Sequence, residues 1–188
     1  MDESLHMTIH FEIFNEADIS DELDKAIRTG LVECFPDDRE HFTRQRWWHS
    51  KPSWSICGFD PEGNVAGNVS IVERNVSVGK DSCRIMVAGI QNFIVLPHWR
   101  KTGLSDRLMA LVLGEAQQRG LDAGLLFCIP ALERVYNRMG WKKIDFAVYM
   151  RNESGLREPI PSKNIAMMVP ILVEQFPPGD VDLMGPDW

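Results

Sequence analysis

The sequence has no residue pattern that would hold a metal ion or a disulfide framework. Its cysteines lie far apart without a C-x-x-C pair, and its five histidines show no metal-ligand spacing. The four cysteines are Cys34, Cys57, Cys83 and Cys128. Such usage is typical of buried, reduced thiols in a cytoplasmic protein. We therefore expect no metal site and no disulfides.

Long apolar runs are also missing. No stretch approaches the length of a membrane span, and the acidic first residues are not followed by an apolar segment. This excludes a signal peptide of the usual kind and a membrane partner. The chain contains no internal repeat and no low-complexity tract, so neither a repeat protein nor a disordered linker is expected.

Positive charge is in deficit. Lys and Arg total 20 against 27 Asp and Glu, a net charge of −7. Nucleic acid is therefore not an expected partner, because its binding needs a basic face. The acidic balance is compatible with a cationic substrate, but it also suits a protein whose charge serves solubility alone.

The composition is that of one globular domain. The chain has 188 residues, 44% of them hydrophobic and 25% charged, which is enough to build a core without staples. Hydrophobic periodicity predicts strands over 8–14, 53–59, 65–73, 83–95, 124–129, 141–150 and 165–172. It predicts helices over 21–31, 39–49, 104–119 and 130–139, the first capped by Ser20. A loop at 151–164 and an irregular tail at 176–188 complete the chain.

One stretch, residues 91–108, dominates the chemistry. A strand stops before Pro97, and a helix with an apolar stripe starts at Leu104. The turn between them reads Arg100-x-x-Gly103-x-Ser105. A helix start of this kind aims free backbone N–H groups and the positive end of the helix dipole at one point, which suits a phosphate. The alternative is an ordinary strand-to-helix connection with a surface arginine.

The residues around this turn resemble a family motif. Val95-x-Pro97-x-x-Arg100-x-x-Gly103-x-Ser105-x-x-Leu108 is similar to the acetyl-CoA motif of the GNAT N-acetyltransferase superfamily. Val135-Tyr136 followed by Gly140-Trp141 resembles the second signature of that superfamily. The resemblance implies a single GNAT-like domain over 1–188 of the α/β (α+β) class. Its central sheet is expected to be mixed, mostly antiparallel and twisted, with helices on its flanks.

A narrower resemblance concerns the acceptor. Trp99, the Gly140-Trp141 pair and the terminal Trp188 are similar to features of aminoglycoside 2′-N-acetyltransferases. Residues 169–171 with the acidic tail resemble rhizobial nodulation N-acyltransferases. Both groups acylate an amino group on a sugar.

The resemblance also implies how acetyl-CoA is held. The strand would splay near Ile94 and Val95, so that its free amides bind the pantetheine arm and polarise the thioester. The turn would bind the pyrophosphate. The expected acetyl-CoA-binding residues are Phe93, Ile94, Val95, Arg100, Lys101, Thr102, Gly103, Leu104 and Ser105.

The candidate catalytic residues are Tyr136, Trp188 and Gln91. Tyr136 would protonate the departing thiolate, unless it is simply a core tyrosine. Gln91 stands where relatives often have a glutamate that relays the proton of the amine, and glutamine is not a base. Ile129 likewise replaces an asparagine found in many members. The base is left open between a water chain, the carboxylate of Trp188, and the acids Asp37, Asp38 and Asp187.

The expected activity is acetyl transfer from acetyl-CoA to a primary amine of a small molecule, such as an amino sugar or aminoglycoside. Two alternatives stay open: a CoA-binding module whose catalysis has decayed, and an N-acyltransferase that uses a longer acyl chain. A homodimer is also left open. For Trp47 and Trp48, a core position is favoured over the wall of a substrate cleft.

Overall fold

The computed structural model describes residues 8–188. Ten strands form one mixed sheet in the order β6-β9-β5-β4-β3-β10-β7-β8, with β2 also paired to β3 and β1 to β2. The strands are β1 (His10–Asn15), β2 (Trp54–Phe59), β3 (Val65–Val78), β4 (Cys83–Val95), β5 (Ala123–Cys128), β6 (Lys142–Lys143), β7 (Val148–Arg151), β8 (Arg157–Pro159), β9 (Ile165–Pro170) and β10 (Val181–Asp182). The α-helices are α1 (Asp21–Cys34), α2 (Arg39–Arg44), α3 (Leu104–Gln118) and α4 (Glu133–Arg138). The expected α/β fold with a mostly antiparallel sheet is confirmed.

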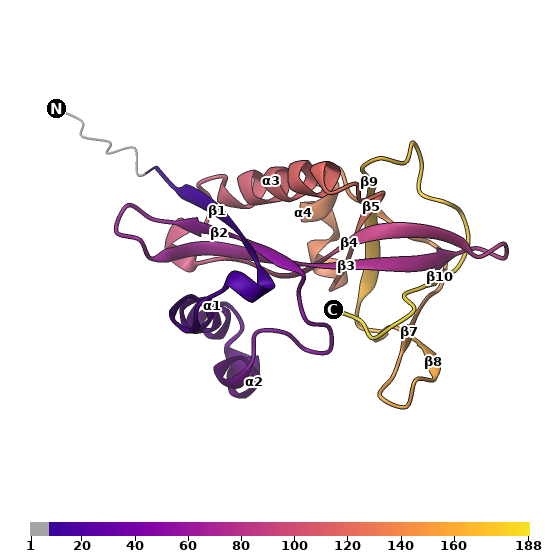
Figure 1. Ribbon diagram of the computed structural model, residues 1–188, viewed down its shortest axis with the longest axis horizontal. Coiled ribbons are helices and arrows are strands. Elements are labelled where there is room, and N and C mark those ends of the chain that lie inside the picture. Colours follow the sequence, from indigo (N-terminus) through magenta and orange to yellow (C-terminus); the bar gives the residue numbers. More distant parts are fainter. Residues whose placement is uncertain (1–7) are drawn as a thin grey trace.

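Helices cover both faces of the sheet (Figure 1). Helix α3 and helix α4 lie on one face, and helix α1, helix α2 and the C-terminus lie on the other. Helix α1 begins where predicted, because Ser20 Oγ accepts a hydrogen bond from Leu23 N at 3.2 Å. It then buries Ile27 and Leu31 completely against the sheet. Of the stripe predicted for α3, Leu104, Leu108, Val112 and Ala116 lie in the largest core cluster, whereas Leu111 is exposed.

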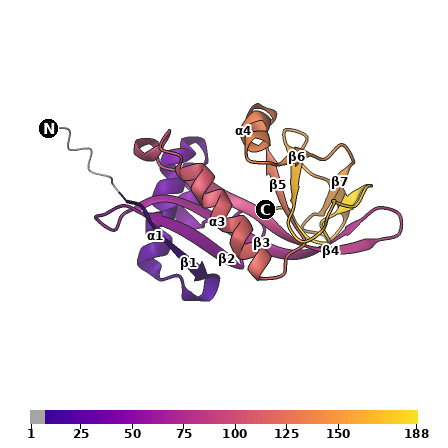
Figure 2. The same ribbon diagram turned by 90° about the horizontal axis from the view of Figure 1, so that it is seen from above.

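Strands β4 and β5 run parallel for only a short distance. Their pairing extends from Val87↔Ala123 to Ile90↔Leu126. Beyond Ile90, β4 continues along β3, whereas β5 continues along β9. The two strands therefore separate at Gln91, and one edge of β4 is left without a partner strand over residues 91–95. Figure 2 shows this region between α3 and α4.

A bulge marks the same place in β4. The register between β3 and β4 shifts between Asn68 and Ser70, and Asn92 has a φ of 51°. A bulge bends the strand and re-aims its side chains. The side-chain amide of Asn68 supports the bend by donating to the carbonyl of Asn92 at 3.1 Å.

The structure corrects the segment after helix α2. That helix ends at Arg44 rather than at residue 49, because Gln45 is already extended with φ −150° and ψ 144°. Arg46 is then pulled inward to ion pairs with Glu16 at 2.6 Å and Asp24 at 2.7 Å. Trp48 was predicted to lie in the core, but the structure leaves it 45% exposed.

Four other predictions were wrong in detail. The strand expected over 141–150 is broken into β6 and β7, because the chain changes its partner from β9 to β10 between them. The loop at 151–164 contains β8, and the tail contains β10. All four cysteines are free, as expected, but Cys83 is exposed and Cys34 is only partly buried.

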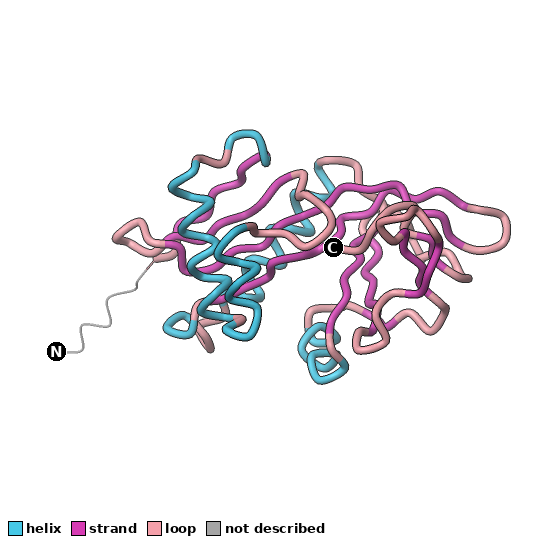
Figure 3. The backbone as a smooth tube through the Cα atoms, turned by 90° about the horizontal axis from the view of Figure 1, so that it is seen from below, coloured by secondary structure: helices cyan, strands magenta, loops and turns pink. Residues whose placement is uncertain are grey.

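The C-terminal tail returns to the middle of the sheet. Figure 3, which views the face of α1 and α2, shows the C-terminus at the centre of that face. Among residues 8–188, no helix is long and apolar enough to cross a membrane.

Candidate active site

The separation of β4 from β5 leaves backbone groups free at the centre of the sheet. Leu96 N donates to Ala66 O on the β3 side of the strand. Because backbone groups point alternately to the two edges of a strand, those of Phe93 and Val95 point toward the opening. Free amides for an extended ligand arm were predicted near Ile94 and Val95. The alternation instead points Phe93 and Val95 toward the opening and turns Ile94 toward β3.

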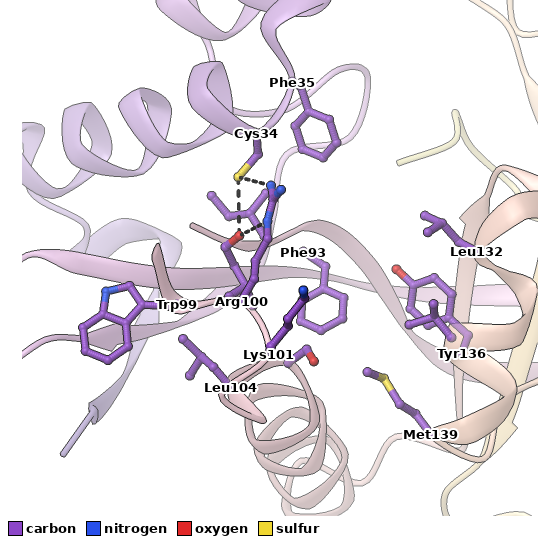
Figure 4. Close-up of a pocket in the computed structure, with 14 residues that line it drawn as sticks. Cys34, Phe35, Phe93, Trp99, Arg100, Lys101, Leu104, Leu132, Tyr136 and Met139 are labelled. Atoms are coloured by element: carbon purple, nitrogen blue, oxygen red, sulfur yellow. Dashed lines mark hydrogen bonds between the residues drawn. The ribbon is translucent and has the colours of Figure 1, made fainter. Parts of the chain in front are cut away.

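A cavity of about 420 Å³ lies beside this free edge (Figure 4). It is lined by Cys34, Phe35, Phe93, Ile94, Val95, Trp99, Arg100, Lys101, Leu104, Ser105, Leu132, Val135, Tyr136 and Met139. The cavity brings together the end of α1, the free part of β4, the start of α3 and one side of α4. Seven of the nine residues expected to bind acetyl-CoA line it. Thr102 and Gly103 do not, and they form the turn next to it.

The turn before α3 is built to present free N–H groups. Lys101 and Gly103 have φ values of 65° and 79°, and the hydroxyl of Thr102 donates to Trp99 O at 2.7 Å. No side chain caps α3, and a Cβ on Gly103 would meet nothing within 4 Å. Gly103 is thus needed for its backbone conformation, and the helix start stays open to an anion.

Arg100 lies across one end of the cavity. Its Nε donates to Val95 O at 3.3 Å, and its Nη2 contacts Cys34 Sγ at 3.8 Å (Figure 4). These contacts hold the guanidinium between the end of α1 and the last residue of β4. Cys34 was not anticipated as part of the site, because it ends a helix distant in sequence and no motif marks it.

Tyr136 projects from α4 into the cavity (Figure 4). Its ring packs near Phe93 and Trp141, each with a centroid separation of 6.3 Å. Burial, and secondarily the neighbouring Cys128, raises the pKa of the Tyr136 hydroxyl above its ordinary value. The hydroxyl is therefore protonated throughout the neutral range, as a proton donor must be.

Gln91 lies where the strands part, on the opposite face from Tyr136. It is buried, and its Nε2 donates to Ser50 O at 2.9 Å. Its Oε1 is buried with no partner among the described residues. An amide in this state has no base function, but its oxygen can accept a hydrogen bond from a ligand.

Trp188 lies on the same face as Gln91. Its ring packs against Phe127 at a centroid separation of 5.2 Å, and the guanidinium of Arg74 lies 5.2 Å from its ring centroid. Gly89 is in contact with the indole, so the C-terminal residue rests on β4 and β5 just before they separate. Trp188 and Gln91 therefore flank the cavity of Tyr136 without lining it.

The three acids considered as possible bases lie in two different places. Asp37 and Asp38 line a separate pocket beside Trp48, together with Glu40 and Arg44. Asp187 instead adjoins Trp188, and its Oδ1 lies 2.7 Å from His49 Nδ1. Among residues 8–188, no group of three His, Cys, Asp or Glu side chains is arranged to hold a metal ion.

Comparison with known proteins decides the family. The family model described as "Acetyltransferase (GNAT) domain" matches residues 19–144. The chain belongs to the GNAT acetyltransferase family. The matched segment of this GNAT chain runs from the start of α1 through the turn before α3 to the strand after α4. A search of curated proteins finds no match in sequence.

Several solved structures share the fold at low sequence identity. A GNAT N-acetyltransferase from Escherichia coli in complex with CoA is 17% identical, with a TM-score of 0.61 over 97% of this chain and 93% of that one. An acyl-CoA N-acyltransferase from Pseudomonas aeruginosa is 15% identical, with a TM-score of 0.60 over 86% and 99%. ElaA from Escherichia coli is 16% identical, with a TM-score of 0.58 over 86% and 99%.

Proposed function

We propose that this protein transfers an acetyl group from acetyl-CoA to a primary amine of a small molecule. One observation carries the proposal: a single cavity joins the free edge of β4, an open helix start and the protonated hydroxyl of Tyr136. Thioester aminolysis needs a polarised carbonyl, a site for the anionic part of the donor and a proton for the leaving sulfur.

Acetyl-CoA fits the groups that the cavity presents. The pyrophosphate would bind the N–H groups that start α3, with charge from Arg100 and Lys101. The pantetheine arm would run along the backbone of Phe93 and Val95, and Ile94, Leu104 and Ser105 would flank it. The length of the donor's acyl chain is part of the proposal, and acetyl suits the apolar end formed by Leu132 and Met139.

The reaction would then proceed at the open end of β4. A neutral amine attacks the thioester carbonyl, and a backbone N–H of β4 stabilises the oxyanion. The C–S bond breaks, and Tyr136 gives its proton to the sulfur. A well-placed general acid contributes roughly 10²–10⁴-fold in rate.

The acceptor would approach from the face of Gln91 and Trp188. The unpartnered Oε1 of Gln91 is suited to accept a hydrogen bond from the amine, which would offset the roughly 1–3 kcal/mol cost of a buried, unpaired polar atom. A cavity of about 570 Å³ on this face is lined by Trp48, Glu153, Glu158 and Asp187, among others. Its three carboxylates and its indole favour a cationic acceptor, such as an amino sugar or an aminoglycoside.

The test is CoA-thiol release from acetyl-CoA over a panel of primary amines, with CoA affinity measured separately by calorimetry. Amine-dependent release with acetyl-CoA supports the proposal. CoA binding without release on any amine favours a decayed binding module. Faster release from longer acyl-CoA thioesters favours an N-acyltransferase with another donor.

A further inference from the structure

A histidine–carboxylate pair faces the cavity on the acceptor side of the sheet. His49 Nδ1 lies 2.7 Å from Asp187 Oδ1, with 50% of the histidine side chain and 14% of the aspartate side chain exposed. Both residues line the 570 Å³ cavity. A carboxylate at Nδ1 holds the imidazole proton there, which leaves the lone pair of the neutral ring on Nε2. No group among residues 8–188 hydrogen-bonds this Nε2.

A hydrogen-bond network centred on the buried Ser50 holds the pair in place. Ser50 is buried and donates from its Oγ to Asp187 O at 2.6 Å. Arg74 donates from Nη2 to the same Oγ at 2.9 Å, and it also donates to the carbonyl of Pro186. The loop that carries His49 and the tail that carries Asp187 are therefore fastened to each other and to β3. Such support keeps a catalytic pair in one geometry.

Each member of the pair adjoins a residue at the point where β4 and β5 part. His49 precedes Ser50, whose carbonyl accepts the hydrogen bond from Gln91. Asp187 precedes Trp188, whose indole contacts Gly89 and Phe127. Consecutive Cα atoms are about 3.8 Å apart, so the pair lies one residue's length from contacts with the separating strands.

We propose that His49, oriented by Asp187, is the general base that removes a proton from the acceptor ammonium group. This inference rests on the proposed function. His49 Nε2 takes one proton, and the lone pair that is freed on nitrogen forms the C–N bond as the C–S bond breaks. The sulfur receives the proton of Tyr136, the nitrogen loses a second proton that restores the tyrosine through solvent, and His49 releases its proton to solvent. Asp187 is a positioning residue in this scheme.

The charged groups near His49 come from the tail, from β3, from the β7–β8 hairpin and from the loop of His49 itself. The tail contributes Asp187, and β3 contributes Arg74 behind it. The hairpin contributes Arg151, Glu153 and Glu158, and the loop contributes Lys51. Arg151 is itself paired with Asp182 at 2.7 Å. Carboxylates thus predominate around the cavity, which favours both a cationic acceptor and the imidazolium that forms when His49 takes its proton.

The test uses the full chain with acetyl-CoA and two kinds of acceptor. The first kind, glucosamine, spermidine and kanamycin, carries ammonium groups at pH 7. The second, hydroxylamine, is largely neutral at that pH and needs no deprotonation before attack. We expect His49→Gln to lower kcat/KM by about 100-fold or more with the ammonium acceptors, but by far less with hydroxylamine. CoA affinity should not change.

The split between kcat and KM separates a base from a structural residue. His49→Gln should lower kcat with the ammonium acceptors and leave their KM nearly unchanged, because the base acts on the proton and does not hold the rest of the acceptor. Asp187→Asn should lower kcat with the same acceptors by less than His49→Gln does, because the imidazole remains but loses its orienting partner.

A matched control is His10→Gln. His10 also pairs with a carboxylate, Glu12 at 3.1 Å, but on the exposed strand β1, so its loss should leave kcat/KM unchanged. An unchanged kcat with the ammonium acceptors in His49→Gln, or an equal loss with both kinds of acceptor, would overturn the role of His49. The role of His49 would also be overturned if the wild type acetylated hydroxylamine but none of the ammonium acceptors. Absence of turnover with every acceptor would instead overturn the proposed function itself.

Discussion

The indole of Trp188 lies in the space that a side chain at Gly89 would fill. A Cβ built on Gly89 would lie 2.6 Å from Cζ2 of Trp188 and closer still to Cε2. Gly89 is not among the residues with positive φ, so its backbone would accept any side chain. The glycine is therefore needed for the C-terminal residue and not for the strand.

This contact predicts the effect of Gly89→Ala. The added methyl group must displace the indole from β4 and β5, which should cost about 1–3 kcal/mol in the free energy of unfolding. It should also raise the KM for the acceptor more than the Kd for CoA. Urea unfolding, amine titrations and calorimetry measure these three quantities.

Gly114→Ala is the matched control for that experiment. Gly114 lies within α3, and a Cβ there would meet nothing within 4 Å. Alanine should therefore stabilise the protein by about 0.5–1 kcal/mol through helix propensity. Equal destabilisation by the two substitutions would contradict the contact between Gly89 and Trp188.

Removal of the Tyr136 hydroxyl should affect turnover but not the binding of CoA. Tyr136→Phe should keep the affinity for CoA and lower kcat by roughly 10²–10⁴-fold, because the sulfur loses its proton donor. Calorimetry and thiol-release rates measure the two effects. If kcat is unchanged, Tyr136 is a packing residue of α4 and takes no part in the chemistry.

The pH dependence of Tyr136 has a definite sign. The hydroxyl must be protonated to act, and burial raises its pKa above the ordinary value of 10.0. Its proton is therefore retained to a higher pH than in free tyrosine. Loss of this proton should not lower kcat at any pH below about 10. A basic limb between pH 7 and 10 that disappears in Tyr136→Phe would refute the assignment.

Arg100 should contribute to binding the phosphates of the donor and not to binding its pantetheine arm. A charge-assisted hydrogen bond contributes about 1.5–3 kcal/mol. Arg100→Gln should therefore weaken CoA binding by roughly 10–100-fold and leave the binding of pantetheine nearly unchanged. Arg107→Gln, on the helix that follows the turn, is the control, because its guanidinium lies over the ring of Phe11, 4.7 Å from the centroid. Similar losses in both variants would mean a general charge effect.

A carboxylate at position 91 should not act as a base. In Gln91→Glu the donor to Ser50 O is lost, and a negative charge faces a carbonyl oxygen. The free energy of unfolding at pH 7 should fall by about 1–3 kcal/mol. A buried glutamate has a raised pKa in the folded state, so stability should be higher at low pH, where the protonated acid can donate, and should be lost as pH rises.

Urea unfolding of Gln91→Glu and the wild type at pH 5 and pH 7 measures this difference. Thiol release should also fall, because the loop that carries Ser50 is no longer held. An increase in turnover would contradict the assignment and point to a base at position 91.

The buried ion pairs of Arg46 should control the loop after α2. Its side chain is 1% exposed and bonds Glu16 and Asp24. Arg46→Met should therefore cost about 3–5 kcal/mol, because the largely buried Glu16 loses its partner and Asp24 keeps only Arg28. Arg44→Met is the control: its pair with Glu40 is exposed at both ends, so the loss should be about 0–1 kcal/mol. Denaturant unfolding of both variants decides the matter, and equal losses would exclude a special role for the buried pairs.

The strand–turn–helix from β4 to α3 could be predicted from the sequence alone. Pro97, Gly103 and the stripe from Leu104 to Leu108 act through local backbone preferences and periodicity, which need no tertiary contact. The cap at Ser20 and the glycine end of α3 belong to the same class. The fold class and the residues around the cavity were implied by the resemblance of this turn and of the Tyr136 segment to the signatures of the GNAT superfamily.

The arrangement on the other face depended on tertiary structure. Helix α2 ends early because Arg46 turns inward to acids distant in sequence, and Trp48 is exposed as a consequence. The strand over 141–150 breaks because its neighbours in the sheet change. His49, Ser50, Arg74 and the tail are joined by contacts across more than a hundred residues, and no periodicity encodes such contacts. The sequence by itself predicted a GNAT-like anion site and a proton donor through local motifs, whereas only the folded chain brought His49 to Asp187, 138 residues further along.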